Sequence, residues 1–268
     1  MKKIWAKFAI AAISFCFIGA VQANAVDPSK PVAGQSQLAL SQQWWQWALG
    51  IPAATNPLID STGEFANLNN NGSVFFLAGN FGGKTVRTIT ISYGKSLFLP
   101  LINNIDVEAP QLGPSCFDPP NDSVAAIACA LAFISPSLEL NQLTDLHATL
   151  DGQDLLTFSS QDFRQTSTSF FDISLPVDNL FGLPSDSYPS VSDGYWLALQ
   201  DIPVGNHVLK FGGTQANGFQ VDVTANLNVV PEPASGALLF SALIALVSAN
   251  RDSIIRKTKS SRKALYAS

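Results

Sequence analysis

The most regular hydrophobic pattern of the chain lies at 219–229. Every second residue is apolar, from Phe219 to Val229, and the residues between them are polar, from Gln220 to Asn228. A period of two residues over this length predicts a β-strand with one buried face and one solvated face. An antiparallel sheet that packs on one side against a second layer is the natural setting for such a strand.

Other short segments rich in β-branched and aromatic residues, separated by turn-forming residues, predict that most of the chain is β. We expect the strands at 73–78, 85–92 and 96–102 to form a β-meander. The segments 193–199 and 208–212 are expected to pair as a hairpin. The predicted fold class is therefore mainly β, an antiparallel β-sandwich with jelly-roll-like character.

Two segments predict helices. The segment 38–49 contains no glycine or proline, and its apolar residues recur at helical spacing. The segment 122–131 predicts a short helix, with Asn121 or Asp122 as its N-cap, inside a long irregular insertion. A third, hydrophobic helix is expected near the C-terminus.

Tryptophan is concentrated in the first of these helices. Trp44, Trp45 and Trp47, together with Trp196, are candidate glycan contacts, because aromatic rings can stack on sugars. The alternative is a helix that docks on the core through the same side chains, and the spacing of Trp44 and Trp47 on one face favours it.

The first 25 residues have the three parts of a secretory signal peptide. A basic start is followed by an apolar stretch at 8–21 and by the small residues Ala23 and Ala25 around Asn24. This pattern predicts cleavage after Ala25, so that the mature chain begins at Val26. The alternative is a retained N-terminal anchor, for which the apolar stretch is short.

The C-terminal region has a similarly ordered arrangement. Val230, Pro231, Glu232 and Pro233 precede an apolar run at 236–249, and basic residues are scattered behind it. This order resembles the PEP-CTERM sorting signal, in which an extended Pro-Glu-Pro motif stays accessible, an apolar helix stops in the membrane and the basic tail stays in the cytoplasm. The resemblance implies processing by an exosortase-type enzyme and transfer to the envelope or to an exopolysaccharide matrix. An uncleaved tail anchor is the alternative.

These features divide the chain into four parts. We expect a signal peptide at 1–25, a linker at 26–37, a β-rich extracytoplasmic domain at 38–229 and a sorting or anchor segment at 230–268. The body also resembles an uncharacterised group of secreted bacterial proteins through the segments NPLIDSTGEF, VFFLAGNFGG and DGYWLALQDIPVGNHVLKFGG.

Charge is distributed unevenly between these parts. Nine of the 15 lysines and arginines lie at the two ends, which leaves six at 26–230 against 18 of the 20 acidic residues, a net charge of −12. Such a surface repels phosphate backbones and excludes nucleic acid as a partner. Divalent cations and polar glycans are compatible with it.

The body contains one pair of cysteines, Cys116 and Cys129, on either side of the helical insertion. In an oxidising compartment this pair predicts a disulfide, and two free buried thiols are the alternative. Asp106 and Glu108, preceded by Asn103 and Asn104, offer oxygen ligands for a calcium ion, although no EF-hand or nonapeptide repeat is present. A solvated acidic loop is the simpler interpretation.

No catalytic motif stands out. His147 and His207 are separate, no Cys-x-x-Cys is present for zinc, and the Gly-x-Ser-x-Gly elbow of a serine hydrolase is absent from the sequence. We therefore expect a non-enzymatic exported protein of the cell surface or extracellular matrix, with a structural or adhesive role in exopolysaccharide, biofilm or floc. The alternatives are a carbohydrate-binding module and a secreted glycan-active enzyme.

Overall fold

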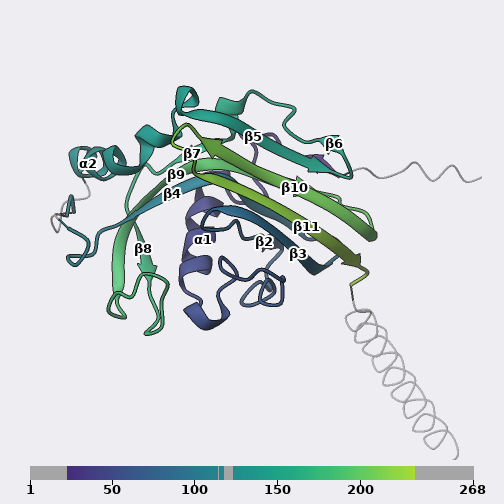
Figure 1. Ribbon diagram of the computed structural model, residues 1–268, viewed down its shortest axis with the longest axis horizontal. Helices are drawn as coiled ribbons and strands as arrows, with labels where there is room; N and C mark the ends of the chain where they lie inside the picture. The colour runs from purple at the N-terminus through teal and green to yellow at the C-terminus, as the bar shows by residue number, and fades with distance from the viewer. Residues whose placement is uncertain (1–22, 114, 118–122, 233–268) are drawn as a thin grey trace, which may run out of the picture.

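The computed structural model describes residues 23–113, 115–117 and 123–232. In this part the chain forms two β-sheets and two α-helices, as the ribbon in Figure 1 shows. The fold is mainly β, as predicted. The predicted C-terminal hydrophobic helix lies outside the described residues, and so does the signal peptide up to residue 22. Among the described residues, no helix has both the length and the apolarity needed to cross a membrane.

The first sheet has the strand order β1-β9-β4-β2, and β7 and β8 also pair with β9. Its strands are β1 (Asn24–Ala25), β2 (Val74–Phe76), β4 (Ser96–Val107), β7 (Arg164–Thr166), β8 (Phe171–Ser174) and β9 (Ser187–Gln200).

The second sheet has the order β3-β11-β10-β5-β6. Its strands are β3 (Gly83–Ser92), β5 (Leu143–Leu150), β6 (Gln153–Asp154), β10 (Gly205–Gln215) and β11 (Gln220–Val230).

The two helices begin at serine caps. Helix α1 (Gln37–Leu49) follows Ser36, whose Oγ accepts a hydrogen bond from the Ala39 N–H at 3.1 Å, so this prediction is confirmed to within one residue. Helix α2 (Val124–Ile134) follows Ser123, which accepts from the Ala126 N–H in the same way. The predicted start of α2 was too early, because Ser123 provides the cap. The described residues also form four short 3-10 helices, η1 (Ala53–Thr55), η2 (Ser135–Leu138), η3 (Leu140–Gln142) and η4 (Ser160–Phe163).

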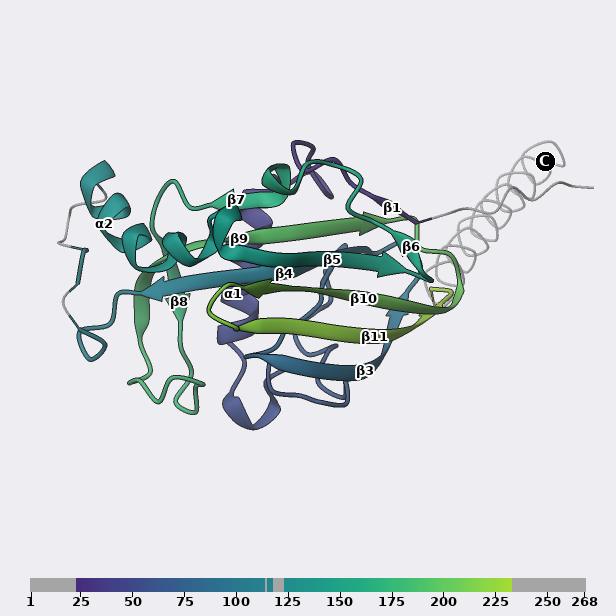
Figure 2. The same cartoon turned by 45° about the horizontal axis from the view of Figure 1, so that its top comes forward.

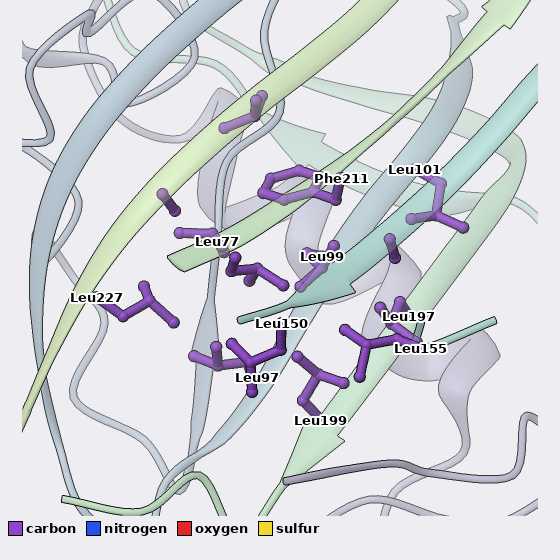
Figure 3. Close-up of a cluster of buried hydrophobic side chains, with 14 of the residues drawn as sticks. Leu77, Leu97, Leu99, Leu101, Leu150, Leu155, Leu197, Leu199, Phe211 and Leu227 are labelled. Carbon is purple, nitrogen blue, oxygen red and sulfur yellow. The ribbon is translucent and has the colours of Figure 1, made fainter. Parts of the chain in front are cut away.

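The main core lies between the two sheets. Leu97 and Leu99 of β4 and Leu197 of β9 meet Phe211 and Leu227 of the second sheet there, as the labelled side chains in Figure 3 show. Strand β11 contributes every second residue to this core, and its intervening polar residues are partly exposed. The alternation predicted from the sequence is confirmed.

Helix α1 covers the opposite face of the first sheet. Trp44 packs there against Trp196 of β9, which stacks on Phe98 of β4, in a second core. The first sheet is therefore buried on both faces, which explains why β9 is buried along most of its length instead of alternating.

Two pairings differ from the prediction. The expected meander does not form, because β2 pairs in parallel with β4 while β3 joins the second sheet, parallel to β11. The expected hairpin is also wrong: β9 pairs with β4, and β10 pairs with β11 and β5. The connection after β9 passes from one sheet to the other, with Asp201 and Gly205 at φ of 58° and 143°. The sheets are consequently mixed, not purely antiparallel.

Both ends of the described chain lie at one end of the sandwich. Asn24 pairs with Gln200 at the end of β9, and Val229 pairs with Gly205 at the start of β10, only a few residues further along the chain. Helix α2 and the far end of β4 lie at the opposite end, which we call the distal end (Figure 2).

Candidate functional site

The distal end contains a pair of carboxyl groups at the end of β4. Asp106 and Glu108 are two residues apart, so the pleat directs both side chains to the same face. Glu108 is 8% exposed. Its Oε2 accepts hydrogen bonds from the Ser115 hydroxyl at 2.5 Å and from the Cys116 N–H at 2.8 Å.

The second oxygen of Glu108, Oε1, is buried and has no hydrogen-bond partner among the described groups. Burial, the neighbouring charge of Glu108 and a hydrogen bond to Glu108 raise the pKa of Asp106 to about 6. We infer that Asp106 holds a proton beside Glu108, an arrangement that we call proton sharing.

A disulfide joins the loop that follows this pair to helix α2. Cys116, in the loop after Glu108, is bonded to Cys129 of α2 with a Cα–Cα distance of 5.7 Å, which confirms the predicted disulfide. A small apolar cluster that includes Ile127, Ala130 and Val191 seats α2 on the sheet. The carboxyl pair lines a cleft of about 120 Å³, whose wall also includes Ser115 of the disulfide-bonded loop and Phe133 of α2.

The structure brings together the two residues predicted as calcium ligands, but adds few others. The amide nitrogen of Asn104 donates to Ile134 O and to Ser137 Oγ, so its side chain is used in packing. Within the described ranges, no group of three or more His, Cys, Asp or Glu residues gathers. Calcium takes six to eight oxygen ligands, and this pair of carboxyl groups provides fewer. A proton held between two carboxyl groups needs no further ligand.

Replacing Asp106 with asparagine tests proton sharing. The folded-state pKa of about 6 exceeds the ordinary value of 3.8, so the folded state holds the proton more tightly, and wild-type stability should fall as the pH rises from about 4 to 7. Asp106→Asn should flatten this dependence and raise the Tm at pH 7. The gain should stay below about 2 kcal/mol, because water screens a partly exposed carboxyl.

Thermal melts from pH 4 to 7 measure the effect, with the exposed Asp172→Asn on β8 as the matched control. A wild-type Tm that rises on adding calcium at pH 7, and does not rise in Asp106→Asn, would point to a bound cation and contradict proton sharing.

The four tryptophans predicted as glycan contacts are buried. Trp44, Trp45, Trp47 and Trp196 are 1%, 5%, 8% and 0% exposed. The indole N–H groups of Trp44 and Trp47 donate to the carbonyls of Leu77 and Leu68. This overturns the sugar-stacking platform, because an external sugar cannot reach these rings, and it confirms the alternative of a helix docked by its aromatic side chains.

A larger cleft of about 380 Å³ lies at the end where the chain enters and leaves, and His207 lines it. The Nδ1 of His207 is 2.7 Å from Asp151 Oδ2, and its Nε2 is 2.9 Å from the carbonyl oxygen of Pro203. Burial alone would raise the pKa of Asp151, but hydrogen bonds from His207 and the Val208 N–H lower it. Because both ring nitrogens face acceptors, neither is free to take a proton from a nucleophile.

One buried charge network was not predicted from the sequence. Asp193 is fully buried and receives hydrogen bonds from Arg164 Nη2 at 2.8 Å and Nε at 3.1 Å. Thr166 donates to the same carboxylate, and Arg164 also contacts Glu139 at 3.0 Å. Hydrogen bonds to Asp193 raise the pKa of Arg164. In the sequence, the only indication of this network is an isolated arginine next to a short β-rich segment.

A second buried arginine holds the loops before β3. Arg87, 2% exposed, donates to the carbonyls of Asp60, Ala78 and Gly79. Burial lowers its pKa to about 10. Both arginines therefore stabilise the folded chain through hydrogen bonds to neighbouring segments.

The comparisons with known proteins add little. No family model matches the chain, and no curated protein matches it. A solved structure described as the solution structure of amebosin covers 54% of this chain and 96% of its own, with 13% identity. Its TM-score of 0.14 indicates no common fold, so the match carries no argument.

Proposed function

We propose that this is an exported, non-enzymatic protein of the cell envelope or extracellular matrix. In this proposal its PEP-CTERM-like motif at 230–233 is a substrate of an exosortase-type enzyme. The C-terminal segment anchors it in the inner membrane, transiently or permanently. The body has a structural or adhesive role in exopolysaccharide, biofilm or floc.

The observation that best supports this proposal is the position of the two chain ends. Strand β1 and the end of β11 lie together at one end of the sandwich, and the sorting motif begins at Val230, the last residue of β11. A domain held there presents the distal end, with α2 and its disulfide, to the surroundings (Figure 2). A disulfide fits an oxidising compartment.

The chemistry of the described clefts also favours a non-enzymatic role. Both ring nitrogens of His207 lie against hydrogen-bond acceptors, and the Asp106–Glu108 pair lines only a small cleft of about 120 Å³. The tryptophans on which the carbohydrate-binding alternative depended are buried, so they offer no surface on which a sugar could stack.

Deleting residues 231–268 tests the sorting step. The shortened protein should disappear from the surface or matrix fraction of the native host, and cell cohesion should fall. Fractionation with immunodetection and an aggregation assay measure both effects.

The matched control replaces only Pro231, Glu232 and Pro233 with alanine and keeps the apolar segment. This variant should stay in the inner membrane with its C-terminus intact. Wild-type location and cohesion for both variants would rule the proposal out.

A further inference from the structure

The sequence around the expected leader cleavage contains two overlapping small-residue patterns. Ala23-Asn24-Ala25 directs cleavage to the bond after Ala25, whereas Val21-Gln22-Ala23 directs it to the bond after Ala23. The prediction of a mature chain that begins at Val26 follows the first pattern, but the second pattern also places small apolar residues on either side of one polar residue.

In the structure, the two residues between these bonds belong to a β-sheet. Asn24 and Ala25 form strand β1, which pairs with Gln200 and Leu199 at the end of β9. The Val26 N–H continues the pairing by donating to the Ala198 carbonyl at 2.9 Å. Ala25 also packs against the core between the sheets.

Cleavage after Ala25 would remove β1 entirely. It would leave the backbone of Leu199 and Gln200 without this partner strand, and open sheet edges are exposed to pairing with other chains. It would also remove Ala23, Asn24 and Ala25 from the lining of the 380 Å³ cleft. Cleavage after Ala23 removes only the Ala23 side chain from the core and leaves β1 in place.

We propose that the leader is removed at the Ala23–Asn24 bond, so that the mature chain begins at Asn24 with β1 in place. Hydrolysis of this bond leaves a carboxylate on Ala23 and a new ammonium group on Asn24. The cleft that Asn24 lines also contains the carboxylates of Asp151 and Asp154, which favour a positive charge there. This inference rests on the proposed export.

Two matched substitutions separate the cleavage positions. A signal peptidase requires a small side chain immediately before the cleaved bond. Ala25→Leu therefore blocks cleavage after Ala25 but leaves the residue before the Ala23–Asn24 bond unchanged, whereas Ala23→Leu blocks cleavage at the proposed bond. Both variants of the full chain are expressed in the native host, and the intact mass of each exported protein is measured.

We expect the wild-type protein and Ala25→Leu to begin at Asn24, and Ala23→Leu to accumulate as the precursor. A wild-type chain that begins at Val26 in the surface fraction, with Ala25→Leu unprocessed, would overturn this inference and leave the proposed function intact. A wild-type chain that keeps residues 1–23 inside the cell would contradict both.

Discussion

Replacing Asp193 with alanine is expected to lower the free energy of unfolding by about 3–5 kcal/mol, because it leaves the Arg164 guanidinium buried without its counter-charge. The side chain of Arg164 is 11% exposed and cannot turn to water without disturbing the pairing of β7 with β9. Thr166 loses its acceptor in the same variant. Urea denaturation followed by circular dichroism measures the change.

The matched control is Glu139→Ala, which removes the other carboxylate bound to Arg164. Glu139 is 57% exposed, so its loss should cost less than about 1 kcal/mol. Replacing the pair together, as Asp193→Leu with Arg164→Met, should recover part of the stability, and it provides a folded variant if Asp193→Ala does not fold. Equal losses for Asp193→Ala and Glu139→Ala would show that the buried pair has no special role.

Local features of the fold could be predicted from the sequence. The alternation along β11 is visible because one face of that strand is in the core and the other is partly solvated. Helix α1 follows from a segment without glycine or proline whose apolar residues recur at helical spacing, and the Cys116–Cys129 disulfide follows from a single pair of cysteines in the body.

Pairing between distant segments could not be predicted in the same way. The turn after β9 looks like a hairpin turn, but it carries the chain from one sheet to the other, and no local signal distinguishes these outcomes. Burial on both faces of β9 hides the alternation that would have indicated its partner. Arg164 and Asp193 meet because β7 pairs with β9, so their contact depends on that unpredicted register.

The carboxyl pair is an intermediate case. The sequence predicts an acidic loop at Asp106 and Glu108, whereas β4 extends to Val107 and the structure places the two carboxyl groups together. The hydrogen bonds that Glu108 accepts from the Ser115 hydroxyl and the Cys116 N–H depend on the insertion that the disulfide closes. The sequence therefore identifies the carboxyl groups, whereas the burial that raises the pKa of Asp106 is visible only in the structure.

The aromatic core under α1 gives the second large expected effect. Trp196 is fully buried, stacks on Phe98 with ring centroids 5.4 Å apart and meets the edge of Trp44 at 5.3 Å. Trp196→Ala should lower the free energy of unfolding by about 3–5 kcal/mol, because it leaves a large cavity between helix and sheet. Chemical denaturation measures this loss.

Trp196→Phe is the matched control, since it keeps an aromatic ring and removes an indole N–H that is buried without an acceptor among the described groups. Its cost should be well below that of the alanine variant, because an orphaned buried donor contributes no stability. Retention of the folded Trp196→Phe protein on native matrix glycan should equal that of the wild type. A selective loss of retention with unchanged stability would instead give Trp196 a direct role in sugar binding and contradict the assignment of this ring to the core.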